Sequence, residues 1–156
     1  MRIIQYPHPT LRHVSKPLKK VDAQLHGVIR EMFDLMYQAK GVGLAANQVG
    51  IGRRLAIIDL APGTQKSELW VLTNPEVVET SGAIKEEEGC LSIPGFTELV
   101  ERPEKVVVRF RDLAGDEKFI EGSGLLARAL CHELDHLDGT LLPQRILGLR
   151  GDLVRK

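Results

Sequence analysis

Residues 123–139 read SGLLARALCHELDHLDG, a stretch that predicts a helix beginning near Ser123 and ending at Gly139. Within it lies the pentad His132-Glu133-Leu134-Asp135-His136. Its two histidines stand about one helical turn apart, so both imidazoles project from one face and can share a metal ion. Glu133 follows the first histidine directly, where a carboxylate can take a proton from a metal-bound water. A structural zinc site, or no site at all, is the alternative interpretation, because such a pentad also arises by chance.

Composition limits the class of protein. The length of 156 residues is typical of one domain, so we expect residues 1–156 to form a single domain. A net charge of zero and 4% aromatic residues give no support to nucleic-acid binding. No apolar run reaches the length of a membrane span, and the first residues lack the apolar segment of a secretory signal. We therefore expect no membrane partner and a cytoplasmic location, with an organelle as the alternative.

The pentad alone does not complete a catalytic metal site, which normally has three protein ligands. The candidates for the third ligand are Cys90, Cys131, His8, His13, His26 and the acidic residues. Cys131 directly precedes His132, so its side chain points about 100° away around the helix and hardly reaches the same ion. Cys90 is the better candidate, because the stretch 86–94 predicts a loop that can be shaped around a metal. In a reducing compartment the two cysteines favour metal binding or catalysis over a disulfide.

The remaining pattern predicts one more helix and several short strands. The helix follows Asp22 as N-cap, has apolar residues at helical spacing and stops at Gly41. Strands are predicted over 54–60 and 69–72, the second ending at a break over 73–75, and a hairpin over 105–112 and 117–121. Two helices without regular β-α-β alternation indicate an α+β fold with mostly antiparallel sheet.

Two further segments bear on chemistry. Residues 41–48, GVGLAANQ, fit a dinucleotide-binding pattern, but they follow a helix and lead toward a strand, which is the wrong context. We therefore interpret them as a loop whose glycines allow close backbone approach to a ligand, with Gln48 offering an amide donor. The run Glu86-Glu87-Glu88 is typical of a solvated face. Because it lies beside Cys90, we expect Glu88 to turn inward.

Three separated segments together resemble a known family. Residues 41–48, Glu88-Gly89-Cys90-Leu91-Ser92 and the pentad resemble, in order and at suitable spacing, the three signature motifs of the peptide deformylases. Residues 7–12 resemble the N-terminal arm of the same family. The resemblance implies an α+β domain in which a central helix carries the pentad among antiparallel sheets. It also implies removal of the N-formyl group from formylmethionine at the N-terminus of nascent polypeptides, with release of formate.

The resemblance also implies a cofactor and partners. One divalent metal ion would be bound by Cys90, His132 and His136, with water as the fourth ligand. Iron(II) is favoured for activity, with zinc, nickel or cobalt as alternatives. The partners would be a formylmethionyl peptide and the ribosome near its exit tunnel.

Roles for the surrounding residues follow from the same resemblance. Glu133 would act as general acid and base, and the Gln48 amide and the Leu91 backbone N–H would bind the developing oxyanion. Backbone groups would bind the peptide at three residues: Val42, Gly43 and Gly89. One face of the pentad helix would line the pocket for the methionine side chain, with Leu125, Arg128 and Ala129.

Several positions depart from the family pattern. Arg128 stands where an aliphatic residue is common, so we expect it either to snorkel to the pocket rim or to alter which side chains are accepted. Cys131 replaces a usual Gln, Asn47 a common Thr and Thr97 a frequent Arg. The tail after Leu142 is shorter than in many bacterial members, which leaves an organellar-like or phage-borne version open.

Two other functions remain open at this point. One is a metallo-amidase or peptidase acting on another N-blocked peptide, which the departures at Arg128 and Thr97 suggest. The other is a metal-stabilised module that binds nascent N-termini without turnover.

Overall fold

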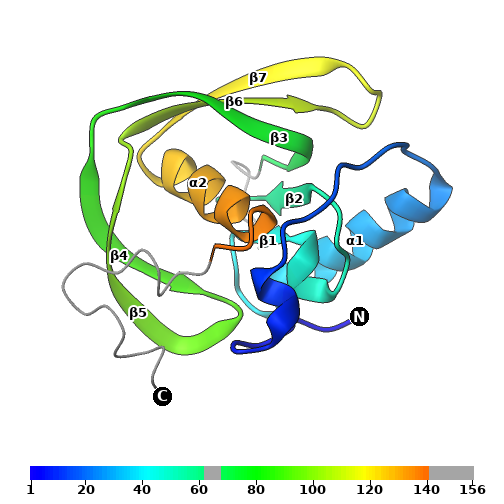
Figure 1. Cartoon of the computed structure of the whole chain (residues 1–156), viewed down its shortest axis with the longest axis horizontal. Helices are drawn as coiled ribbons and strands as arrows, with labels where there is room; N and C mark the ends of the chain where they lie inside the picture. Colours follow the sequence, from blue (N-terminus) through cyan, green and yellow to red (C-terminus); the bar gives the residue numbers. More distant parts are fainter. Residues whose placement is uncertain (62–67, 141–156) are drawn as a thin grey trace.

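Seven strands form two antiparallel sheets in residues 1–61 and 68–140, the part of the chain that this computed structural model describes (Figure 1). The larger sheet has the order β1-β2-β3-β6-β7. Its strands are Gly43–Ala45, Leu55–Ile58, Trp70–Ser81, Lys105–Arg111 and Glu117–Ser123. The smaller sheet is a ribbon of β4 (Ile84–Cys90) and β5 (Ile93–Arg102). The tail after Leu142 lies outside the described residues.

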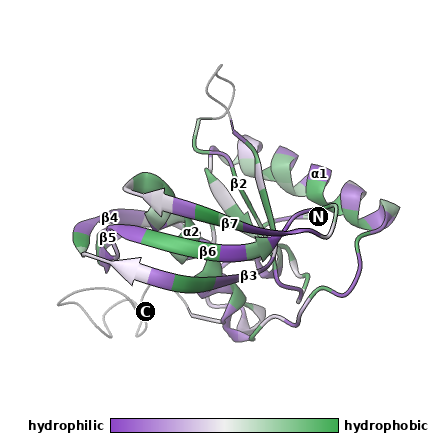
Figure 2. Ribbon diagram, turned by 90° about the horizontal axis from the view of Figure 1, so that it is seen from above, coloured by the Kyte–Doolittle hydropathy of each residue, from purple (hydrophilic) through white to green (hydrophobic). Residues whose placement is uncertain are grey.

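Helix α1 (Ala23–Gln38) begins as predicted. The Asp22 side chain accepts a hydrogen bond from the backbone N–H of Leu25 at 2.9 Å, which satisfies one of the free donors of the first turn. The residues that α1 buries are Leu25, Ile29, Met32 and Met36, all members of the predicted apolar stripe. Figure 2 shows hydrophobic and hydrophilic residues alternating along this helix.

Helix α2 (Leu125–Leu137) carries the pentad. It begins after Gly124, which has a φ of 58°, because Ser123 still belongs to β7. Gly139, with a φ of 74°, follows its end as predicted. The helix packs against β1, β2, β6 and β7, so its side chains are fixed from several directions (Figure 1).

Strand β2 lies between the two helices and is buried along its whole length. Leu55 and Ile57 pack in the cluster that contains the apolar face of α1. Ile58 packs with Ala129 and Leu130 of α2. Because successive residues of a strand point to opposite faces, this short run serves two hydrophobic cores at once.

The predicted loop over residues 41–48 is wrong in part. Residues 43–45 form β1, which pairs with β2, and residues 46–49 form the short 3-10 helix η2 (Ala46–Val49). A second 3-10 helix, η1 (Pro9–Arg12), lies in the N-terminal arm. Both β1 and η2 are too short to show a period in the sequence. Pairing with β2 decides the conformation of β1.

The predicted loop around Cys90 is also wrong. Residues 84–90 form β4 and residue 93 begins β5, which leaves a two-residue turn at Leu91 and Ser92. Three consecutive glutamates give this strand no apolar alternation in the sequence, and of the three only Glu88 is buried. The expectation that Glu88 turns inward is confirmed.

The predicted break over residues 73–75 is an irregularity within β3 and does not end the strand. The register with β6 shifts between Thr73 and Glu76, and Asn74 has a φ of 48°. The Asn74 side chain bonds both backbone groups of Leu18, which holds the bend in place. The β6–β7 hairpin, by contrast, forms as predicted.

These elements confirm an α+β domain with antiparallel sheets. Among the described residues, neither helix combines the length and the apolar character that crossing a membrane would need.

Candidate metal centre

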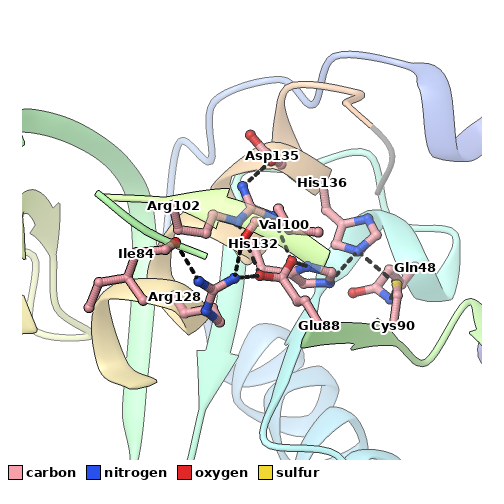
Figure 3. Close-up of polar contacts among 10 residues, drawn as sticks. All are labelled: Gln48, Ile84, Glu88, Cys90, Val100, Arg102, Arg128, His132, Asp135 and His136. Atoms are coloured by element: carbon pink, nitrogen blue, oxygen red, sulfur yellow. Dashed lines mark hydrogen bonds and ion pairs between the residues drawn. The ribbon is translucent and has the colours of Figure 1, made fainter. Parts of the chain in front are cut away.

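Three ligand-type side chains converge from two elements (Figure 3). Helix α2 supplies His132 and His136, and the last residue of β4 supplies Cys90. Nε2 of His136 lies 3.1 Å from Nε2 of His132 and 3.2 Å from Sγ of Cys90. The ligand atoms of the three residues all lie within 4.8 Å of one another.

The donor set fits a divalent metal ion. Nδ1 of His132 donates to Oε2 of Glu88 at 2.7 Å, so in the neutral ring Nε2 keeps the lone pair that faces the other donors. Burial lowers the pKa of His136 well below its usual value, which keeps that ring neutral. Ligands around one tetrahedral ion of zinc size stand about 3.3–3.7 Å apart, close to the separations of 3.1 and 3.2 Å around Nε2 of His136.

The other candidates for the third ligand do not join this group. Within the described part of the chain, the cluster does not include His8, His13, His26 or Cys131. Cys131 packs instead against the hydrophobic core cluster that lies between the large sheet and α2.

Glu133 lines a cavity together with Cys90 and His132, and its residue is 3% exposed. Its Oε1 has no hydrogen-bond partner among the described residues. Burial raises the pKa of Glu133 to about 7, against the opposing effect of His132. A carboxyl group with this pKa can both accept and donate a proton near neutrality.

Gln48 is held in one orientation by its neighbours. Its Oε1 accepts from the backbone N–H of Ala45 at 2.9 Å, and its Nε2 donates to Oγ of Ser92 at 3.0 Å. The same Nε2 lies 3.7 Å from Sγ of Cys90. The amide donor therefore points toward the metal ligands, and Leu91 lies in the turn directly after Cys90.

A cavity of about 780 Å³ adjoins these residues. Of the twelve residues to which the family resemblance assigns a role, the cavity is lined by all but one, namely Val42, Gly43, Gln48, Gly89, Cys90, Leu91, Leu125, Arg128, Ala129, His132 and Glu133. The remaining one, His136, is not among the lining residues and is buried. Leu125 is 56% exposed, which places it at the open side of the cavity, whereas Ala129 is buried.

The expectation that Arg128 snorkels to the rim is wrong. Its side chain is buried, and its guanidinium donates to Oε1 of Glu88 at 2.9 Å. It also donates to the backbone carbonyls of Ile84 at 3.0 Å and Val100 at 3.2 Å. A carboxylate and two carbonyls replace the water that a rim position would have offered.

Sequence reasoning missed two members of this network, Arg102 and Asp135. Arg102 donates hydrogen bonds to both carboxylate oxygens of Glu88, at 3.1 and 2.6 Å. It also donates to Oδ2 of Asp135 at 2.6 Å. Burial alone would raise the pKa of Glu88, but hydrogen bonds from His132 and Arg102 outweigh it and hold the pKa well below its usual value. Arg102 ends a charged strand and carries no local signal of this role.

Asn47, one of the departures noted in the sequence, supports helix α2. Its Nδ2 donates to the backbone carbonyl of His136 at 2.6 Å. An amide at this position thus binds a carbonyl near the end of α2 directly.

Gly43 approaches Glu133 so closely that a side chain there would collide with it. A Cβ atom at residue 43 would overlap Oε2 of Glu133. We expect Gly43→Ala to lower the kcat of the predicted deformylation by about 10²-fold. The added methyl group would displace Glu133, the predicted general acid and base, and misplacing a reacting group by about 1 Å costs that much. Gly27→Ala, which meets no atom within 4 Å, is the matched control, and equal activity of the two variants would contradict the prediction.

Comparison with known proteins agrees with this geometry. The family model described as polypeptide deformylase matches residues 1–150. A peptide deformylase of Thermodesulfovibrio yellowstonii is 46% identical over 156 residues, covering 100% of this chain and 94% of the relative. The crystal structure of a peptide deformylase from Legionella pneumophila superposes with a TM-score of 0.92 at 42% identity, covering 99% of this chain and 90% of the other. A peptide deformylase from Synechococcus elongatus, solved in complex with actinonin, has a TM-score of 0.92 at 40% identity and covers 95% and 81% of the two chains.

Proposed function

The chain belongs to the peptide deformylase family, and we propose that Cys90, His132 and His136 hold its metal ion while Glu133 transfers the proton. The protein is a peptide deformylase, a metalloenzyme that removes the N-formyl group from nascent polypeptides. One observation carries the assignment of residues: ligand atoms of Cys90, His132 and His136 converge within 4.8 Å of one another, beside the cavity that Cys90, His132 and Glu133 line.

The chemistry divides between the ion and the protein. A bound divalent ion supplies a Lewis acid that acidifies water and polarises the formyl oxygen. Glu133 accepts the proton of the attacking water on its carboxylate and then delivers it to the nitrogen of the leaving amine. Its pKa of about 7 suits both transfers.

Charge that develops on the formyl oxygen needs fixed donors. Nε2 of Gln48, oriented by Ala45 and Ser92, is one of them, and the backbone N–H of Leu91 is the other. A well-placed donor of this kind contributes about 3 kcal/mol to stabilisation of the transition state.

The cavity also explains substrate binding. Backbone groups of Val42, Gly43 and Gly89 pair with an extended peptide as an added strand would. Leu125 and Ala129 form an apolar wall for the methionine side chain. Because the Arg128 guanidinium is turned into the protein, the charge does not occupy this wall.

Membership of the family supports a proposal for the setting of the enzyme. We place the whole chain, residues 1–156, in a single catalytic domain whose central helix is α2, with iron(II) as the activating ion. Zinc, nickel or cobalt also suit a Cys-His-His set. The relatives named above are bacterial, which supports a cytoplasmic enzyme that meets its substrates near the ribosomal exit tunnel.

Metal removal tests the proposal. Protein purified anaerobically should release formate from formyl-Met-Ala-Ser, lose that activity after treatment with a chelator and regain it when iron(II) is restored. The metal content of the same samples should follow the activity.

Three peptides separate the alternatives: the formyl, acetyl and unblocked forms of Met-Ala-Ser. Turnover of the acetyl peptide at a similar rate would indicate a broader amidase. Tight peptide binding without formate at any metal loading would indicate a binding module and would refute the proposed function.

A further inference from the structure

The proposed metal ligands lie on two elements that belong to different parts of the fold. Cys90 ends β4 in the two-stranded ribbon, whereas both histidines lie on α2. Among the described residues, the ribbon and the larger sheet are two separate sheets. The position of the sulfur relative to the imidazoles therefore depends on the contacts that hold the ribbon to α2, together with the bonds that Tyr6 and Gln48 make to Ser92 in the turn after Cys90 (Figures 1 and 3).

A buried ionic cluster makes this connection. Glu88 on β4 accepts hydrogen bonds from Arg102 of β5 and from Arg128 and His132 of α2. Arg102 also reaches back to Asp135 of α2. The cluster pairs two carboxylates with two guanidinium groups, so its formal charges balance without counting the histidine.

Arg128 has a distinct place in this cluster. Its three acceptors all lie on the ribbon: Oε1 of Glu88 and the carbonyl of Ile84 on β4, and the carbonyl of Val100 on β5. One α2 side chain thus fixes both strands of the ribbon to the helix. It also fixes the carboxylate whose other oxygen holds Nδ1 of His132 at 2.7 Å.

Arg102 cannot take over this task. It belongs to the ribbon, and its Nε and Nη2 already bind Glu88 while Nη1 binds Asp135. Without Arg128, Oε1 of Glu88 would keep a single contact, at 3.1 Å, and the carbonyls of Ile84 and Val100 would lose the contacts made by Arg128. Losing one partner of a buried ionic network frees the others to move.

We propose that Arg128 is a positioning residue of the metal centre, which sets the orientation of His132 through Glu88 and the placement of Cys90 through the ribbon. This inference rests on the proposed function, because it takes Cys90, His132 and His136 as the metal ligands. It gives Arg128 a part in the geometry of the centre and not in selection of the peptide.

The test compares two substitutions at this residue. Arg128→Met keeps the apolar stem and removes the donors, whereas Arg128→Lys keeps the charge but replaces a planar fork with one ammonium group. Loss of a residue that orients a metal ligand typically weakens metal binding about 10–100-fold. We expect Arg128→Met to release cobalt(II) to a chelator about tenfold faster than the unsubstituted protein and to change its visible absorption spectrum. Arg128→Lys should be intermediate.

Two control variants separate positioning from stability. Arg109→Met makes the same substitution in the exposed ion pair with Glu76, and Val108→Ala removes buried volume from the core beside α2. Both should keep the cobalt spectrum and the release rate, even where the melting temperature falls. The kcat of Arg128→Met for formyl-Met-Ala-Ser should fall while KM changes less than twofold.

Several results would overturn the inference. In one, Arg128→Met melts at a lower temperature but keeps the spectrum and the release rate, as a merely structural residue would. In another, only KM changes, or the preference between formyl-Met and formyl-Leu peptides, which would make Arg128 a specificity residue. If Arg128→Met fails to fold, an unchanged spectrum in Arg128→Lys overturns it. An unsubstituted protein that binds no cobalt would refute the proposed function together with this inference.

Discussion

Glu133→Gln is expected to lower kcat/KM for formate release by about 10²–10⁴-fold, the usual contribution of a general acid and base. Glutamine has almost the same shape as glutamate but cannot accept the proton of the attacking water. The metal content of the variant should stay close to that of the unsubstituted protein, since Glu133 is not among the proposed ligands. Steady-state formate release and metal analysis on the same sample measure both quantities.

The same substitution should stabilise the metal-free protein at alkaline pH. Burial raises the pKa of Glu133 from 4.5 to about 7, so the folded state favours the protonated form. Stability associated with that form is fully present below pH 4.5 and is lost as the pH rises through 7. The gain from Glu133→Gln should therefore be near zero below pH 4.5, grow between pH 4.5 and 7, and level off at roughly 3 kcal/mol.

Denaturant unfolding at a series of pH values measures this gain. Glu87→Gln is the matched control, because Glu87 lies on the same cavity but is exposed. If Glu133→Gln lowered kcat/KM for formate release by less than tenfold, another group would transfer the proton. A variant that is less stable than the unsubstituted protein at pH 8 would contradict the burial argument.

Cys90→Ala should abolish stoichiometric metal binding, whereas Cys131→Ala should preserve it. Removing a direct ligand should cost more than the 10–100-fold in affinity lost with an outer partner, so we expect a loss of at least about 10²-fold. Formate release should fall in parallel. The two cysteines form a natural pair for this experiment, because Cys131 is adjacent in sequence to His132 yet packs beside the core cluster between the large sheet and α2.

Competition with a chelator, measured with cobalt(II) or iron(II) under anaerobic conditions, gives the two affinities. Cys131→Ala should cost stability on the order of 1 kcal/mol through the lost volume of a thiol. If both variants kept one tightly bound ion, the sulfur of Cys90 would not be a ligand. If Cys131→Ala lost the ion, the neighbouring helix face would need a new interpretation.

The helices were predictable because their signals are local. Asp22 caps α1 by bonding a backbone N–H three residues away, and Gly139 adopts the left-handed conformation that ends α2. The pentad spacing places both imidazoles on one face for the same reason. Each of these features involves residues within about one or two turns of each other.

The strands around the site were less predictable, because pairing with another strand decides them and their own residues show no clear period. Residues 43–45 become a strand only by pairing with β2, and residues 84–90 only by pairing with β5. Within the glutamate run only Glu88 is buried, and the three identical residues carry no signal that distinguishes it. Strand formation is decided by such pairings more than by intrinsic preference.

The amino-acid sequence by itself determined the type of chemistry: the pentad indicates a metal site, and its resemblance, together with the segments around Cys90 and Gln48, to the signature motifs of a known family implies a deformylase. Only the tertiary structure decided where Arg128 points and that Arg102 shares its carboxylate. Glu88 stands 14 residues from Arg102 and 40 residues from Arg128 along the chain. A buried guanidinium takes the direction in which its donors find acceptors, and those acceptors exist only once the ribbon has folded against α2.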